Sequence, residues 1–160
     1  MATVREIARQ VVDALPEDAD FSDVDEFLYE RAMVEQGRDE LAAGKTRWPG
    51  RLTPLTDAKR PQVVWSEHAA ADFEVTLASS EASSPEEAHA FESAVLQAAS
   101  SVASDPGVGM TLPEMGDPSI KEVPIGTSHI RYRLLYDFKD RVVRILWFMN
   151  NTTCYRNVRG

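Results

Sequence analysis

The cationic side chains of the last forty residues are the groups in this sequence best suited to bind a phosphate or another anion. Residues 121–160 hold eight Lys and Arg against three Asp and Glu, whereas residues 61–120 hold ten acidic residues and neither Lys nor Arg. Residues 1–60 are acidic on balance, and the formal charge of the whole chain is −9. This balance argues against a protein that coats nucleic acid non-specifically, because phosphate binding needs clustered Lys and Arg. The basic C-terminal segment is either a binding surface or a solvated sheet edge.

The other reactive side chains form no pattern typical of a metal or nucleophilic site. The three histidines have no Glu or Cys at ligand spacing, so we expect no metal. Ser66, Ser84 and Cys154 lack a His-acid pair at recognisable spacing, which argues against a covalent nucleophile. Gly107-Val108-Gly109 is turn composition without the Lys-Ser/Thr of a phosphate-binding loop. We therefore expect no cofactor.

The composition indicates a cytoplasmic chain with no membrane partner. The single cysteine cannot form an internal disulfide, so nothing asks for an oxidising compartment. Residues 1–10 lack the unbroken apolar core of a secretory signal. No stretch approaches the roughly 18–20 apolar residues that a membrane span needs.

The first 44 residues predict two helices. Apolar residues recur at helical spacing over residues 3–15, and Pro16 ends that helix. A second helix begins near Phe21, with Ser22 as its N-cap, and stops at Gly44. Gly37, inside this helix, costs about 1 kcal/mol relative to Ala, so the helix depends on packing for its stability.

Residues 45–61 predict an extended connector. Its prolines are spaced too closely for a helix and too irregularly for a central strand. It also carries Trp48, Leu52 and Leu55, which a free linker would not need. A strap bound along another module is therefore favoured over a flexible tether.

A second module is expected from residue 62 onward. The pattern predicts a strand over 62–65, helices over 67–77 and 85–104 that form a hairpin, and strands over 120–125, 129–138 and 141–148. Ser66 caps the first of these helices, and Ser84-Pro85 begins the second. Lys139-Asp140 is a two-residue connection, so the last two strands form an antiparallel hairpin.

Alternation along these strands keeps the arginines out of the core. One face of the first hairpin strand carries Tyr132, Leu134, Tyr136 and Phe138, and the other carries Arg131, Arg133, Leu135 and Asp137. The next strand alternates in the same way, with one face carrying Val143, Ile145 and Trp147 and the other carrying Val142, Arg144 and Leu146. The simplest expectation for Arg133 is a surface ion pair with Glu122 or Asp137.

The order strand, helical hairpin, three antiparallel strands resembles the RelE/ParE superfamily of bacterial toxins. Residues 63–73 (VVWSEHAAADF) resemble the family's opening strand and helix, and residues 84–88 (SPEEA) resemble the start of its second helix. Residues 132–136 (YRLLY) are similar to its most recognisable strand. The likeness covers residues 62–149, and the motifs occur in the right order. The resemblance implies an α+β fold in which an antiparallel sheet is packed by a helical hairpin.

The N-terminal segment looks like the short helical antitoxins that accompany such toxins. The resemblance rests on residues 15–19 (LPEDA), residues 21–24 (FSDV) and residues 31–44. It divides the chain into an antitoxin-like module over 1–44, a strap over 45–61 and a toxin-like domain over 62–160. The acidic residues near 13–40 would complement the basic C-terminal sheet, and tethering would raise the effective concentration of the arm to roughly millimolar.

The partner implied is thus an antitoxin-like segment, either of the same chain or swapped from a neighbouring copy in a homodimer. The fusion is natural or engineered; the sequence leaves both open. We see no ribbon-helix-helix or helix-turn-helix element for binding DNA.

The resemblance also implies a metal-independent chemistry. In nuclease members Lys and Arg stabilise the phosphate in the transition state while a basic or aromatic side chain moves protons. The positions that correspond in this sequence are Lys121, Arg131, Arg133, Arg144, Tyr155 and Arg156. The sequence departs from the pattern at Asn150-Asn151-Thr152-Thr153, where nuclease members usually place a basic residue or histidine, and neutral groups cannot deliver a general base near neutral pH.

Three functions remain open. The first is a toxin-antitoxin protein that is silenced by its own N-terminal arm. The second is an active ribosome-dependent mRNA endonuclease, and the third is a gyrase-inhibiting binder of the ParE type, which needs no catalytic set.

Overall fold

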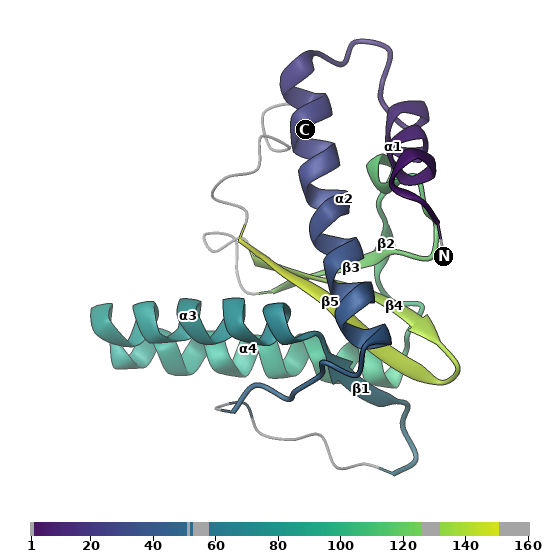
Figure 1. The fold of residues 1–160 in the computed structure, drawn as a ribbon. Coiled ribbons are helices and arrows are strands. Elements are labelled where there is room, and N and C mark those ends of the chain that lie inside the picture. The colour runs from purple at the N-terminus through teal and green to yellow at the C-terminus, as the bar shows by residue number, and fades with distance from the viewer. Residues whose placement is uncertain (1, 51, 53–57, 126–131, 151–160) are drawn as a thin grey trace.

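The computed structural model describes residues 2–50, 52, 58–125 and 132–150. Within those ranges the chain forms four α-helices and a five-stranded sheet, an α+β fold (Figure 1). The elements in chain order are α1 (Val4–Asp13), α2 (Phe21–Ala42), β1 (Gln62–Trp65), α3 (Glu67–Ser83), α4 (Pro85–Ser104), β2 (Met110–Thr111), the short 3₁₀ helix η1 (Pro113–Met115), β3 (Lys121–Ile125), β4 (Tyr132–Lys139) and β5 (Val142–Asn150). No helix in the described ranges is long and apolar enough to cross a membrane.

The sheet is mixed, with the strand order β1-β5-β4-β3-β2. β2, β3, β4 and β5 pair antiparallel, as the sequence predicts for the last three strands. The expectation of a wholly antiparallel sheet is wrong for β1, which lies parallel to β5. Parallel neighbours need a long crossover connection, and the helical hairpin with the strands that follow it supplies one.

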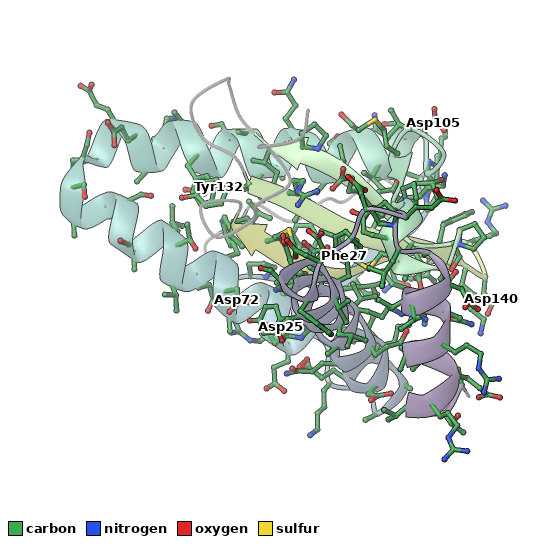
Figure 2. The ribbon with its side chains drawn as sticks, turned by 90° about the horizontal axis from the view of Figure 1, so that it is seen from above. Asp25, Phe27, Asp72, Asp105, Tyr132 and Asp140 are labelled. Carbon is green, nitrogen blue, oxygen red and sulfur yellow. The ribbon has the colours of Figure 1, made fainter. Side chains whose placement is uncertain are left out.

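Helices cover both faces of the sheet (Figures 1 and 2). The α3–α4 hairpin lies on one face, over a core whose larger members are Trp65, Phe73, Leu77, Phe91, Val95, Leu134, Tyr136, Ile145 and Phe148. The N-caps predicted for this hairpin are confirmed. Ser66 accepts a hydrogen bond from the Ala69 N–H, and Ser84, which directly precedes Pro85, accepts one from the Glu87 N–H. α2 lies across the opposite face with α1 beside it.

A β-bulge in β5 changes which side chains enter each core. Leu135 pairs with Trp147 and Tyr136 pairs with Ile145, so Leu146 has no partner on β4. The extra residue reverses the alternation beyond it. Trp147 therefore packs on the α2 side and Phe148 on the hairpin side, whereas simple alternation places Trp147 with Val143 and Ile145.

Two local expectations are corrected. The N-cap of α2 is Asp20 rather than Ser22, because Asp20 and Asp23 exchange hydrogen bonds of 3.0 Å in a capping box. The β4–β5 turn is Asp140-Arg141, one residue later than expected, and Lys139 still pairs with Val142. Both turn residues have positive φ, 52° and 62°, as a two-residue hairpin turn with matching twist requires.

α1 is fixed to the rest of the fold through a close backbone approach. It begins with a Thr3–Glu6 capping box and buries Val11. Gly116, just after η1, has a φ of 65°, and a Cβ there would lie 2.4 Å from the carbonyl oxygen of Gln10. Glycine is therefore needed both for the turn and for the contact with α1.

Candidate functional site

The sheet face under α2 carries Arg133 and Arg144, two of the arginines that the sequence singles out, and α2 covers it with a stripe of buried residues. Glu30, Arg31, Val34 and Gly37 are buried at helical spacing on the side of α2 that faces the sheet. Val34 is completely buried, in a core formed with Leu112, Met115, Ile120, Leu135, Leu146, Trp147 and Met149. The helix and the sheet thus share one hydrophobic core on this face.

Gly37 is the point of closest approach between α2 and the sheet. A Cβ at this position would lie 2.2 Å from the Leu146 carbonyl oxygen and 2.9 Å from its carbon. Neither backbone can rotate away from such a contact. The glycine that weakens an isolated helix is therefore what lets α2 lie directly on the bulged segment of β5.

Directly after Gly37, Arg38 of α2 joins three acidic side chains from different elements. Its guanidinium donates to Glu35 at 3.0 Å, to Asp117 at 2.9 Å and to Asp137 of β4 at 3.2 Å. It also donates to the Ser119 hydroxyl at 3.0 Å. Burial alone would lower the pKa of Arg38, but the hydrogen bond to Asp117 and the surrounding carboxylates raise it above its usual value.

Asp137 is shared between α2 and the sheet. Arg144 of β5 binds both of its carboxylate oxygens, and Arg38 reaches one of them from α2. Asp137 is nearly inaccessible, at 2% exposure. A buried carboxylate held by two arginines ties the helix to the hairpin, and removal of either arginine leaves this buried charge with only one cationic partner.

Arg31 closes the other side of this network. It pairs with Glu35 at 2.9 Å and donates to the backbone carbonyl of Met115. Burial opposes ionisation of Asp117, but hydrogen bonds from Ser119 and Arg38 lower the pKa of that carboxyl. The loop around η1 is thereby fixed to α2.

Arg133 lies in a second, more buried pair on the same sheet face. It binds Glu122 of the neighbouring strand, and both residues are 7% exposed. The sequence predicts a surface ion pair here; the partner is confirmed, but the location is wrong, because α2 covers the site. The pKa of Glu122 is raised overall. Burial raises it most, the neighbouring Arg133 lowers it, and the charge of the buried Glu30 on α2 raises it further. An acidic residue of α2 thus acts on the pair that holds Arg133.

The structure brings together two of the six residues that the toxin resemblance assigns to catalysis. Arg133 and Arg144 lie on the face under α2. Lys121 pairs in register with Tyr136, whose side chain lies in the hairpin-side core, so Lys121 belongs to the opposite face. Arg131, Tyr155 and Arg156 lie outside the described residues, as do residues 151–153.

The C-terminal end of α2 is held by His68, a residue that the sequence pattern did not single out. Glu40 accepts hydrogen bonds from the His68 backbone N–H at 3.1 Å and from its Nδ1 at 3.0 Å. Burial opposes the charge on Glu40, but these hydrogen bonds lower its pKa overall. The His68 Nε2 atom is buried and has no hydrogen-bond partner among the described atoms.

The described part of the connector lies against β1 and α3. Thr46 forms a β-bridge with Ser66, and Arg47 pairs with Glu74 of α3. The Trp48 ring packs edge-on to Trp65, with centroids 6.3 Å apart. Its indole N–H donates to the carbonyl of Leu52, which is 3% exposed.

These contacts correct the expected charge complementarity. The sequence predicts an acidic arm against a basic sheet, but in the main network Arg31 and Arg38 of the arm meet carboxylates of the loop and the sheet. The basic residues of the sheet are already paired within it, Arg133 with Glu122 and Arg144 with Asp137. The net charge of a segment does not show which of its residues face the partner.

In this arrangement the face offers little to an external anion. Arg38, Arg133 and Arg144 each have a carboxylate partner, so a phosphate would have to displace a carboxylate and α2 together. Among the described residues no three His, Cys, Asp or Glu lie together in a way that could hold a metal.

Comparisons with protein-family models, with curated proteins and with solved structures found no match to this chain. The toxin resemblance therefore stays a prediction.

Proposed function

We propose that this chain is a toxin-antitoxin protein in which a RelE/ParE-like toxin domain is silenced by an antitoxin-like arm of the same polypeptide. In this proposal α1 and α2 form the arm, residues 45–61 are the strap, and the domain from residue 62 onward is the toxin. The arm masks the sheet face that would otherwise meet the toxin's target.

The order of elements supports the toxin part of the proposal. From residue 62 the chain runs through a strand, a helical hairpin and, after the short β2, three antiparallel strands, with β1 beside β5. The motifs quoted from the sequence fall on β1 and the start of α3, on the start of α4, and on β4.

The observation that carries the silencing part is the shared Asp137. Arg38 of the arm and Arg144 of the hairpin hold the same buried carboxylate. Nearby, Gly37 brings the arm into backbone contact with β5. The charge of Glu30 on the arm raises the pKa of Glu122 in the Glu122–Arg133 pair. An arm bound in this way occupies the surface that a phosphate-bearing target would need.

Bacterial growth tests the proposal. Expression of residues 61–160 should slow growth, whereas the full chain should not. A full chain with Gly37→Leu and Arg38→Glu should also slow growth, because the larger side chain cannot fit against Leu146 and the reversed charge faces Asp137. Gln36→Leu, one position away and exposed, serves as the matched control and should be harmless.

Removal of the arm exposes a hydrophobic core, so folding must be controlled. The soluble yield and circular dichroism of residues 61–160 are measured beside growth, with and without residues 1–60 supplied as a separate chain. If the fragment folds and the full-length double variant folds, yet both are harmless, the proposal is wrong.

Two assays on the toxic form separate the possible targets. Cleavage of mRNA on ribosomes that stops with Arg133→Ala or Arg144→Ala would assign the endonuclease activity. Inhibition of DNA supercoiling by purified gyrase, with mRNA intact, would assign the gyrase-directed activity.

A further inference from the structure

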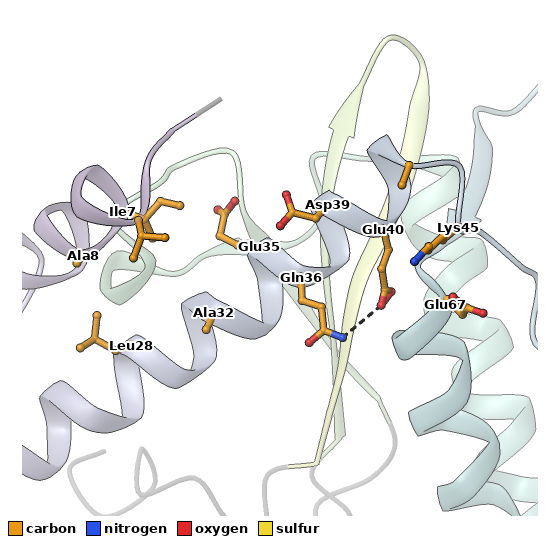
Figure 3. A pocket seen from close by; sticks show the side chains of 12 residues that line it. Ile7, Ala8, Leu28, Ala32, Glu35, Gln36, Asp39, Glu40, Lys45 and Glu67 are labelled. Carbon is orange, nitrogen blue, oxygen red and sulfur yellow. Dashed lines mark hydrogen bonds between the residues drawn. The ribbon is translucent and has the colours of Figure 1, made fainter.

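A groove of about 890 Å³ runs along the side of α2 that faces away from the sheet (Figure 3). One face of α2 forms its floor, α1 walls one end, and the first turn of α3 walls the other. The lining residues are Val4, Ile7 and Ala8 of α1, Leu28, Ala32, Glu35, Gln36, Asp39 and Glu40 of α2, and Ala43, Lys45 and Glu67. Apart from Glu35, which also pairs with Arg38, this surface is separate from the face that holds Arg38 against Asp137.

The two ends of the groove differ in chemistry. Near α1 the lining is aliphatic apart from Glu35, whereas toward α3 it carries Asp39, Glu40 and Glu67 against the single ammonium of Lys45. Glu35 and Glu40 are already engaged, by arginines and by His68. Asp39 and Glu67 are exposed and form no salt bridge within the described residues.

The end of α2 adds to this negative potential. Its last turn contains no basic residue, so the partial negative charge of the helix C-terminus is not neutralised from within the helix. The groove therefore suits a segment with small aliphatic residues on one side and cations next to them.

α1 itself presents such a segment, in which Val4 and Ala8 also line the groove. Val4 is 84% exposed and Val12 is 52% exposed, and with Ala8 they are spaced four residues apart along one stripe. Arg5 and Arg9 are exposed next to the same stripe. An aliphatic stripe this open to water is typical of a surface that meets a partner.

We propose that α1 of one chain lies in the α1–α2 groove of a second copy of this chain, and that the second copy reciprocates. The aliphatic stripe of α1 packs on Leu28 and Ala32 of the other copy, while Arg5 and Arg9 face Asp39 and Glu67. A ten-residue helix is about 15 Å long, and residues 28–43 of α2 span about 22 Å, so the floor is long enough. Each chain carries both halves of the contact, so a two-fold dimer closes without leaving a free end. This dimer does not depend on the toxin proposal.

Charge reversal in the full-length protein tests the dimer, with sedimentation equilibrium as the readout. The first variant, Arg5→Glu with Arg9→Glu, makes the helix acidic. The second, Asp39→Lys with Glu67→Lys, makes the groove basic. Each variant alone should weaken self-association at least about tenfold, because like charges then meet in both halves of the interface.

An equimolar mixture of the two variants distinguishes this interface from a general effect of charge. In the mixed dimer one half of the contact is native and the other half has both charges exchanged, so the affinity should return to near that of the native chain. A single chain with all four substitutions should recover in the same way. The substituted residues are exposed, and circular dichroism checks that each variant is folded.

A native chain that stays monomeric at about 100 µM overturns the proposal. So does a dimer that neither variant weakens, or variants that fail to rescue each other. A labelled peptide of residues 2–15 identifies the alternative: if the native chain binds the peptide but does not dimerise, the groove belongs to another cationic helix and the second-copy assignment is wrong.

Discussion

Replacement of Gly37 by alanine should destabilise this protein, although alanine is the better helix former. The new Cβ would lie 2.2 Å from the Leu146 carbonyl oxygen, whereas ordinary contact begins near 3.4 Å, so α2 must move away by about 1.2 Å. Overpacking between two backbones costs up to about 3 kcal/mol. The gain in helix propensity returns about 1 kcal/mol. We expect a net loss of about 2 kcal/mol in the free energy of unfolding, or about 4–8 °C in Tm.

The measurement is urea unfolding followed by circular dichroism, with Gln36 as the internal reference. Gln36 is exposed on the same helix, so Gln36→Ala should be more stable than Gln36→Gly by about 1 kcal/mol. Both reference variants lose the same hydrogen bond to Glu40, so their difference isolates helix propensity. At position 37 the order of Gly and Ala should be reversed. A Gly37→Ala protein as stable as the native chain would refute the close packing of α2 on β5.

Three further changes probe separate contacts. Alanine substitutions at Arg38 and Asp137 should show a coupling free energy of about 0.5–3 kcal/mol in a double-mutant cycle of unfolding. The exposed Arg47–Glu74 pair is the control and should show about 0–1 kcal/mol. Equal couplings for the two pairs would contradict a buried network. Because the pKa of Glu40 is lowered on folding, its contribution to stability is fully present above the ordinary value of 4.5 and is lost as pH falls below it. Unfolding free energies measured from about pH 7 to pH 3 should therefore fall less steeply for Glu40→Gln, and an unchanged slope would exclude this role. Arg141→Gly should stabilise the hairpin by about 0.5–1 kcal/mol in thermal unfolding, since relief of left-handed strain at a φ of 62° exceeds the entropy cost of glycine, and a loss of stability would count against the assigned turn.

Elements with strong periodicity and clear caps could be predicted from the sequence. The helix pattern over residues 3–15, the caps at Ser66 and Ser84-Pro85, and the three final strands all depend on neighbouring residues, so local rules find them. The sequence predicts Ser22 as the N-cap of α2, whereas the structure has Asp20. Both residue types are good N-caps, and the choice between them depends on the reciprocal hydrogen bonds of Asp20 with Asp23.

The features that could not be predicted depend on contacts between distant segments. An extra residue in β5 follows from pairing with β4, and no residue type near Leu146 signals it. Two of the carboxylate partners of Arg38, Asp117 and Asp137, are 79 and 99 residues away in the chain, so a local sequence pattern does not show its role. The sequence offers one signal of this packing, which is Gly37. A glycine inside a helix of 22 residues lowers the stability of the helix, and a close approach to another backbone is the contact that offsets this loss.

The charge pattern misled for a related reason. Net charges of segments predicted an acidic arm on a basic sheet, but the Arg38–Asp137 pair that links the two uses the minority charge of each segment, and Arg133 pairs within the sheet. Asp39 and Glu67 instead line the outer groove. The identity of a partner therefore depends on which side chains share a face and not on the sum over a segment.

The most direct test of the account is growth of cells that express residues 61–160 together with residues 1–60 as a separate chain. We predict slow growth with residues 61–160 alone, restored growth when the arm is supplied, and no restoration when the arm carries Gly37→Leu and Arg38→Glu. Normal growth with the folded domain alone, or equal rescue by the native and substituted arms, would contradict it.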